Sequence, residues 1–291
     1  MAGYLEKKDV LALVAVLAAC LAVGSAFDYQ ISLALFDPAN LFGRLIEAMG
    51  ELPFEIVASV AGVMLVRCAR RESKGSIAAA VLGVAVNVAL FAYEVMSALR
   101  NNGALVPLAA AVSVGVTVAA NVVIFRLTRD ASRFELLRWA VMVLMVWVAQ
   151  AILLNLVVKP LWSRPRMRVI AATPGLEFQP WWVIGHPGRD AFIAAGVIKD
   201  GFRSFASGHT AHAALGLMLA ALPVPAFRAN PGRRRAALWL AAAVAVLVAC
   251  GRIVAGAHFL SDVTCGFATS LLFECIAARL VYPPAARKGV Q

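Results

Sequence analysis

Two histidines and an aspartate stand at spacings that suit nucleophilic and acid–base chemistry. His258 and Asp262 are four residues apart, so they share one face if the segment is helical. A carboxylate there can hold the tautomer of an imidazole and stabilise positive charge on it, which leaves one ring nitrogen free to attack. His209 directly follows Ser207 and Gly208, and an imidazole there can act as a general acid. These three residues, His258, Asp262 and His209, are the candidate catalytic residues.

Basic residues add a candidate anion site. Arginine presents a planar fork that grips phosphate oxygens, and lysine adds a point charge. The stretch KPLWSRPRMR spans residues 159–168, and a further arginine stands six residues before His258. A helix that begins at Ser207 and Gly208 would offer free backbone N–H groups to an anion. The candidate phosphate-binding residues are Lys159, Arg166, Ser207, Gly208 and Arg252, with Arg164 and His212 as further candidates.

The composition indicates an integral membrane protein. Of 291 residues, 62% are hydrophobic, whereas soluble domains are nearer half apolar. The net charge of +11 would suggest a nucleic-acid partner in a soluble protein, but membrane proteins collect Lys and Arg in cytoplasmic loops. We therefore expect the lipid bilayer, and not nucleic acid, as the partner. Five cysteines without CxxC spacing are interpreted as small buried hydrophobes, neither disulfides nor metal ligands: Cys20, Cys68, Cys250, Cys265 and Cys275.

Eight apolar runs have about the length of a membrane-spanning helix, which takes about 20 residues. They cover residues 10–27, 52–67, 76–99, 103–126, 139–158, 208–227, 236–253 and 259–281. We expect an all-α bundle of about eight transmembrane helices. The first run favours a membrane anchor over a cleaved signal peptide, because the residues after Cys20 stay apolar.

Clusters of Lys and Arg orient this bundle. With eight spans, five clusters fall on one side, at residues 7–8, 67–74, 126–138, 228–235 and 279–288. The positive-inside rule makes that side the cytoplasm. Both termini are then cytoplasmic, and all the candidate site residues fall at the extracytoplasmic face.

One loop breaks the charge rule. Residues 159–207 are expected outside, yet they carry seven Lys and Arg residues. Lipid headgroups attract such charges, but a cluster this tight, directly after a span, favours an anion site. Pro and Gly within 173–188 argue against a long helix there, and Trp181 and Trp182 are expected at the membrane interface. Residues 27–53 are expected on the same side, with a helix on the membrane surface.

These residues resemble the PAP2 family, the type 2 phosphatidic acid phosphatases related to vanadium haloperoxidases. The three motifs of that family are Lys-x6-Arg-Pro, Pro-Ser-Gly-His and Ser-Arg-x5-His-x3-Asp. The corresponding residues here are Lys159-x6-Arg166 followed by Met167, Ser207-Gly208-His209 preceded by Ala206, and Arg252-x5-His258-x3-Asp262 preceded by Gly251. Arg164-Pro165 is an Arg-Pro pair at another spacing, so either arginine remains a candidate for the first motif.

The resemblance implies a helical bundle with its site at the membrane–water boundary and a metal-independent lipid phosphatase without a cofactor. His258 would attack phosphorus and form a phosphohistidine, Asp262 would orient it, and His209 would protonate the leaving oxygen. The residues implied to hold the phosphoryl oxygens are Lys159, Arg166, Ser207, Gly208 and Arg252. Phosphatidic acid, phosphatidylglycerophosphate, undecaprenyl diphosphate and a lipid A phosphate all satisfy the same motifs. A bacterial inner or plasma membrane is the implied location.

The resemblance covers about residues 139–281. We therefore divide the chain into N-terminal transmembrane helices at 1–138, a catalytic core at 139–281 that includes the loop 159–207, and a cytoplasmic tail at 282–291.

Four other functions fit parts of the pattern. A phosphotransferase would pass the phosphoryl group to a sugar or another lipid. An anion carrier would need basic residues across the membrane, with Glu94 and Glu274 as a relay within the spans; otherwise these glutamates face the bundle interior or snorkel. An intramembrane serine protease would pair Ser207 with His258, but Phe205 stands where such proteases have Gly. A metal site of His209, His212, His258 and Asp262 is disfavoured by the neighbouring cations.

Overall fold

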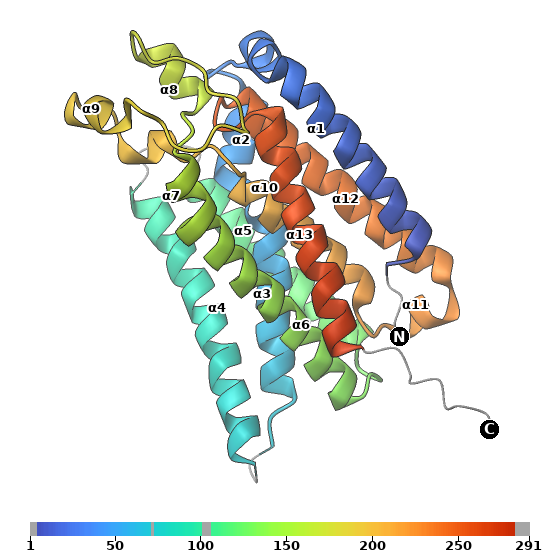
Figure 1. Cartoon of the computed structure of the whole chain (residues 1–291). Helices are drawn as coiled ribbons and strands as arrows, with labels where there is room; N and C mark the ends of the chain where they lie inside the picture. Colours follow the sequence, from blue (N-terminus) through green and yellow to red (C-terminus); the bar gives the residue numbers. More distant parts are fainter. Residues whose placement is uncertain (1–4, 71–72, 101–105, 283–291) are drawn as a thin grey trace.

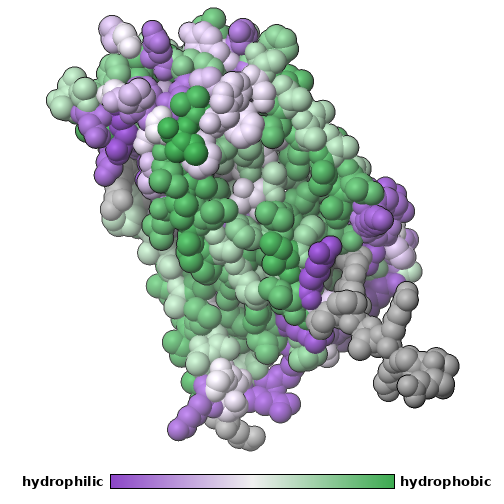
Figure 2. Space-filling view, in the orientation of Figure 1, coloured by the Kyte–Doolittle hydropathy of each residue, from purple (hydrophilic) through white to green (hydrophobic). Residues whose placement is uncertain are grey.

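The chain forms a bundle of long helices (Figure 1). The structure is a computed structural model that describes residues 5–70, 73–100 and 106–282. These residues form helices and connecting loops without a strand, which confirms the expected all-α bundle. Figure 2 shows apolar residues covering the middle of the bundle between two more hydrophilic ends. Within the described chain, seven helical segments are long and apolar enough to cross a membrane: Lys7–Leu35, Leu41–Arg67, Lys74–Met96, Val106–Leu127, Arg133–Ala172, Pro231–Val254 and Leu260–Val281.

The N-terminal half contributes five helices, α1 (Lys7–Leu35), α2 (Leu41–Met49), α3 (Leu52–Arg67), α4 (Lys74–Arg100) and α5 (Val106–Leu127). Helix α1 extends well beyond the expected 10–27. The short helix expected within 27–53 exists as α2, whose start is capped by Asn40 through hydrogen bonds from the N–H groups of Phe42 and Gly43. It packs against α12 and α5, and its position on the membrane surface stays a prediction. A Cβ on Gly43 would lie 3.2 Å from the backbone nitrogen of Ala255.

The C-terminal half begins with α6 (Arg133–Ala151), which continues through a π-helical stretch, Ile152–Val158, into α7 (Lys159–Trp162). A capping box between Ser132 and Glu135 starts α6. Ser163 ends α7 with a left-handed conformation (φ 46°), and the chain then turns back toward the bundle. Two long helices, α12 (Pro231–Val254) and α13 (Leu260–Val281), complete this half.

The sixth predicted span, 208–227, is not one long helix. It divides into α10 (Gly208–Ala214), a 3₁₀ segment (Leu215–Ala221) and α11 (Pro225–Ala229). Seven α-helical and seven 3₁₀ residues rise only about 25 Å together, short of the about 30 Å of a bilayer core. In Figure 1, α10 accordingly starts among the long helices, with α8 and α9 beyond it.

Segment 208–229 still leads from one end of the bundle to the other. Ser207 donates its backbone N–H to the carbonyl of Asp262 at the start of α13, over 2.9 Å. At the far end, Arg228 pairs with Glu135 at the start of α6, over 2.7 Å, and Arg235 pairs with Asp9 at the start of α1, over 2.8 Å. The basic clusters at 126–138 and 228–235 therefore share one end, opposite the candidate site.

The loop that follows α7 folds onto the bundle. It contains α8 (Met167–Ala172), α9 (Arg189–Ala194) and a 3₁₀ turn (Lys199–Phe202), and it has no long helix within 173–188, as expected. The Trp181 indole donates to the hydroxyl of Ser25 on α1 over 2.9 Å. This part of the loop is thereby tied to α1; an interfacial position for Trp181 and Trp182 stays a prediction.

Two glutamates within the long helices face inward. Glu94 and Glu274 are both buried, as expected for glutamates that face the bundle interior.

The cysteines differ from their interpretation as buried residues. All five are free, but four are only partly buried and Cys250 on α12 is exposed. An apolar outer surface explains this, because a small apolar side chain is tolerated on either side of a membrane helix.

Candidate active site

Four parts of the chain bring the candidate residues together at one end of the bundle. Lys159 opens α7, Arg166 precedes α8, and Ser207 caps α10. The last turn of α12, the connection to α13 and the first turn of α13 carry Arg252, His258 and Asp262. The carbonyl of Arg252 accepts the N–H of His258 over 3.3 Å, and this bond folds residues 252–258 into a compact turn. Gly256 makes the turn possible with φ +63°, and a Cβ there would meet the ring of Phe36 at 2.5 Å.

The ring of His258 is held by a backbone carbonyl. The side chain is 2% exposed, and its Nδ1 lies 2.6 Å from the carbonyl oxygen of Ser204. A carbonyl only accepts hydrogen bonds, so Nδ1 carries the proton and Nε2 keeps its lone pair. Burial, together with the positive charges of Arg252 and Arg166, lowers the pKa of His258 to about 3 despite the nearby Asp262. The ring is therefore neutral and nucleophilic at Nε2.

Asp262 lies close to His258 without a direct hydrogen bond to its ring. Its Oδ2 lies 3.8 Å from His258 Nδ1, beyond hydrogen-bond distance. The same oxygen accepts from the Ser204 hydroxyl over 2.5 Å and from the backbone N–H of Phe259 over 2.8 Å. The expected carboxylate–imidazole pair is therefore an electrostatic pair with Ser204 between, and the sequence analysis did not single out Ser204.

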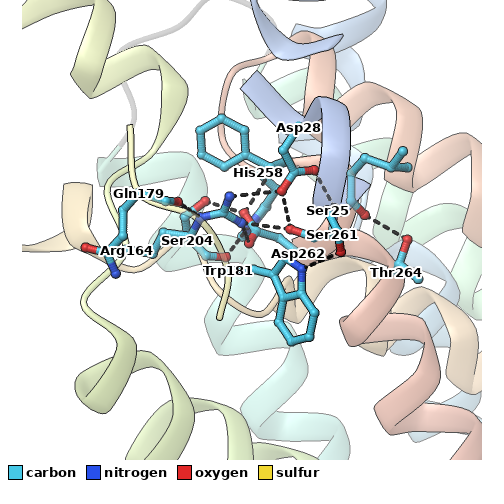
Figure 3. A network of polar contacts seen from close by, with 12 residues as sticks. Ser25, Asp28, Arg164, Gln179, Trp181, Ser204, His258, Ser261, Asp262 and Thr264 are labelled. Carbon is cyan, nitrogen blue, oxygen red and sulfur yellow. Dashed lines mark hydrogen bonds and ion pairs between the residues drawn. The ribbon is translucent and has the colours of Figure 1, made fainter. Parts of the chain in front are cut away.

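Arg164 lies beneath this pair, at the centre of a buried polar network (Figure 3). It is fully buried. It donates to Asp262 Oδ1 over 2.5 Å, to Asp28 Oδ2 over 2.9 Å and to the carbonyl of Gln179 over 2.7 Å. Its guanidinium is therefore committed to carboxylates and a carbonyl, and a phosphate would have to displace them.

Asp28 brings α1 into the network, and the sequence analysis did not select it. It is 3% exposed, and its Oδ1 accepts the backbone N–H of Ser261 over 2.9 Å. The Ser261 hydroxyl donates to its other oxygen. A Cβ on Gly24 would lie 3.0 Å from both Asp28 Oδ1 and Ser261 N, so Gly24 permits the close approach of α1 and α13. The sequence feature that could have identified Asp28 was a carboxylate beside an apolar run.

Two other arginines keep donors without a hydrogen-bond partner. Arg166 pairs with Asp200 over 3.0 Å, and Arg252 lies 3.8 Å from Glu47. Both side chains are less than a tenth exposed. Arg166 Nε and both Nε and Nη1 of Arg252 have no hydrogen-bond partner among the described residues. Buried N–H groups of a cation are costly to leave unpaired, so an anion such as phosphate would complete them.

Lys159 and the start of α10 lie side by side. Lys159 Nζ donates to Asn155 over 3.3 Å, and a Cβ on Gly208 would lie 3.1 Å from that same Nζ. Ser207 is buried, and its hydroxyl accepts the N–H of Thr210 over 3.3 Å as a helix cap. Gly208 thus leaves room for the lysine head beside the first turn of α10.

The two histidines of α10 share one carboxylate. Glu51 Oε1 lies 3.3 Å from His209 Nδ1, and Oε2 lies 2.6 Å from His212 Nδ1. The ring of Phe54 stacks on His212 with centroids 4.6 Å apart. His209 is 25% exposed, far more than His258. His212 is therefore a partner of Glu51, a residue that the sequence analysis noted only as one of several charges in 27–53.

No three His, Cys, Asp or Glu side chains in the described chain are placed to hold a metal ion. The candidate site is instead rich in cations, whose charge opposes metal binding. The residues present are suited to an anion.

Comparison with known proteins identified one family. A family model described as the PAP2 superfamily matches residues 138–284, just over half of the chain. No curated protein and no solved structure matches. The matched region includes Lys159, Arg166, His209, His258 and Asp262. The two carboxylates that reach the site from α1 and from the start of α3 lie outside it.

Proposed function

The chain belongs to the PAP2 superfamily, and on this premise we propose that it is a membrane phosphatase that hydrolyses a lipid phosphate through a phosphohistidine. The observation that carries the proposal is the surroundings of His258. Its Nδ1 is held by the Ser204 carbonyl, and two buried arginines beside the ring keep unpaired donors. A nucleophile next to cationic N–H groups that can bind phosphoryl oxygens is the arrangement that phosphoryl transfer requires.

In the first step, His258 Nε2 attacks phosphorus and the bond from phosphorus to the leaving oxygen breaks. The His258 ring becomes positively charged as the N–P bond forms, and Asp262 stabilises that charge at 3.8 Å. His209 gives its Nε2 proton to the leaving oxygen, which departs as an alcohol from a monoester or as a protonated lipid monophosphate from a diphosphate.

In the second step, a water molecule attacks phosphorus and the N–P bond breaks. His209, now neutral, accepts a proton from that water at Nε2 and is ready for the next cycle. His258 regains its lone pair, and inorganic phosphate leaves. Each proton released is thus taken up by a named nitrogen, and the two steps return the site to its starting state.

Three cations would hold the phosphoryl oxygens through both steps. Arg166 and Arg252 offer buried, unpaired N–H groups, and Lys159 adds an ammonium beside Gly208. Charge spreads over the equatorial oxygens of a transferring phosphoryl group, and fixed cations stabilise it. This clamp supplies the electrostatic part of the catalysis.

An amphiphilic substrate suits the surroundings of Lys159. Leu156 and Leu161, which flank it in the sequence, are 72% and 54% exposed. Exposed leucines beside a phosphate clamp favour a lipid whose tail stays in the bilayer while its phosphate meets the cations. We further propose that this end of the bundle faces away from the cytoplasm, because the predicted cytoplasmic clusters lie at the opposite end.

The proposal is tested by phosphate release from four lipids in detergent with EDTA: phosphatidic acid, phosphatidylglycerophosphate, undecaprenyl diphosphate and a lipid A phosphate. The wild type is expected to release phosphate from at least one, and His258→Ala from none. Release that needs added zinc would contradict the metal-independent mechanism. Transfer of the phosphoryl group to an added sugar or lipid, without free phosphate, would identify a phosphotransferase instead.

A further inference from the structure

A carboxylate from outside the PAP2 region lies between the two histidines of α10. Glu51 stands at the junction of α2 and α3, and its side chain is 17% exposed. One of its oxygens lies 2.6 Å from His212 Nδ1 and the other 3.3 Å from His209 Nδ1. The residue therefore contacts the ring that the proposed mechanism uses as a general acid.

This contact favours one tautomer of His209. The negative charge of an ionised carboxylate favours a proton on the ring nitrogen that faces it, here Nδ1 at 3.3 Å. With Nδ1 protonated toward Glu51, the second proton of the imidazolium resides on Nε2, where the leaving oxygen would receive it. After that transfer the ring is neutral with a lone pair on Nε2, which is the form needed to accept a proton from water.

Glu51 is itself held in place from the other side. The contact from His212 Nδ1 is the shorter of the two, and the ring of Phe54 stacks on His212. Gly50 brings the chain close to His209: a Cβ there would lie 3.3 Å from the ring and 2.5 Å from the carbonyl oxygen of Ile46. His212 thus anchors one carboxylate oxygen, and the other is left for His209.

The charges around His209 give the carboxylate a second effect. Burial and the charge of Arg252 hold the pKa of His209 well below its ordinary value, and Glu51 opposes that shift. The negative charge of a bound phosphate would act in the same direction as Glu51. Glu51 and the bound phosphate together therefore favour the protonated ring that the acid step needs.

We propose that Glu51 is a positioning residue that orients His209 as the general acid and favours its protonated form once a phosphate is bound, with His212 as its anchor. The inference rests on the proposed phosphatase function and deepens it. It implies that the site is incomplete without the N-terminal half of the chain.

The test uses leaving groups that differ in their need for a proton. An alkyl lipid phosphate expels an alkoxide and needs a general acid, whereas para-nitrophenyl phosphate expels a stable phenolate and does not. Glu51→Gln is expected to lower kcat/KM for the lipid phosphate by about 10²–10⁴-fold, the usual range for general acid catalysis. For para-nitrophenyl phosphate the loss is expected to stay below about tenfold.

Matched variants complete the design. Glu55→Gln makes the same substitution one helical turn later, at a buried glutamate outside the site, and should leave the ratio of the two activities unchanged. Glu51→Asp should recover part of the lipid activity. His209→Gln should show the same selective loss as Glu51→Gln, and the double variant should lose no more than either alone.

The experiment distinguishes a failure of the proposed phosphatase function from a failure of the proposed role of Glu51. If the wild type hydrolyses neither substrate, the proposed function fails. If the wild type hydrolyses both and Glu51→Gln lowers the two kcat/KM values in parallel, the function stands and the role of Glu51 is overturned. If Glu51→Gln does not fold, Glu51→Asp and His212→Asn are compared with the wild type on the same two substrates.

Discussion

At the scale of single residues, the two arginines of the RPR stretch differ in their surroundings. Arg164 is fully buried and bonds to two carboxylates, whereas Arg166 keeps Nε unpaired beside Asp200. Motif spacing alone left either arginine open as the phosphate ligand. Their partners separate them, because a guanidinium that already neutralises two buried carboxylates cannot leave them for a transient ligand without a large cost.

Substituting each arginine by lysine should separate these roles. Arg166→Lys keeps the charge but loses the fork, so it should raise KM and lower kcat/KM by about 10–100-fold with little effect on stability. Arg164→Lys should lower stability by about 2–3 kcal/mol, somewhat less than removing a buried partner outright, and lower kcat with KM unchanged. Steady-state kinetics on a lipid phosphate and thermal unfolding in detergent measure both. A selective rise of KM in Arg164→Lys would contradict this assignment.

At the scale of elements, helices outside the PAP2 region complete the site. Helix α1 brings Asp28 to Ser261 and Arg164, and the start of α3 brings Glu51 to α10. Close helix packing makes the first contact possible, since a Cβ on Gly24 would lie only 3.0 Å from the backbone nitrogen of Ser261. Small residues serve the same purpose at many membrane helix interfaces. The N-terminal helices are thus part of the scaffold of the site.

Widening the α1–α13 contact should therefore impair catalysis from a distance. Gly24→Val places a side chain against Asp28 and the Ser261 backbone, so α1 must move outward. We expect a loss of about 1–3 kcal/mol in stability, as for other overpacked sites, and at least a roughly tenfold fall in kcat through Asp28 and Arg164. Gly115→Val is the control, because a Cβ at Gly115 has nothing within 4 Å. Equal activity of the two variants would show that α1 does not support the site.

The segment 208–229 shows why hydropathy misjudged one element. Its middle is apolar, but residues such as Leu215, Leu217 and Met218 are completely buried within the protein. A run of apolar residues has the same appearance whether lipid or protein covers it. Where protein covers the backbone, irregular helix is tolerated at membrane depth, so α10 can give way to a tighter 3₁₀ segment.

At the scale of the whole molecule, the sequence predicted the helical bundle and the common end of the motif groups. That prediction depended only on successive spans placing alternate loops, with their basic clusters, on opposite sides of the membrane. It holds despite the irregular sixth segment, because this segment still joins the site to the end where Arg228 meets Glu135. The contacts that complete the site were beyond sequence patterns. Asp28 and Arg164 are 136 residues apart, and Glu51 and His212 are 161 apart, so only the packing of α1 and α3 on the core brings them together.

The central claim is that the phosphoryl group passes through His258, and it is tested most directly by trapping that intermediate. The protein would be mixed with para-nitrophenyl phosphate, quenched at alkaline pH and digested, and its peptides examined by mass spectrometry. We expect a phosphoryl group on His258, more of it in His209→Ala because the water step lacks its base, and none in His258→Ala. Phosphate release by the wild type with no phosphorylated His258 at any time point, or with the phosphoryl group on another residue, would contradict the account.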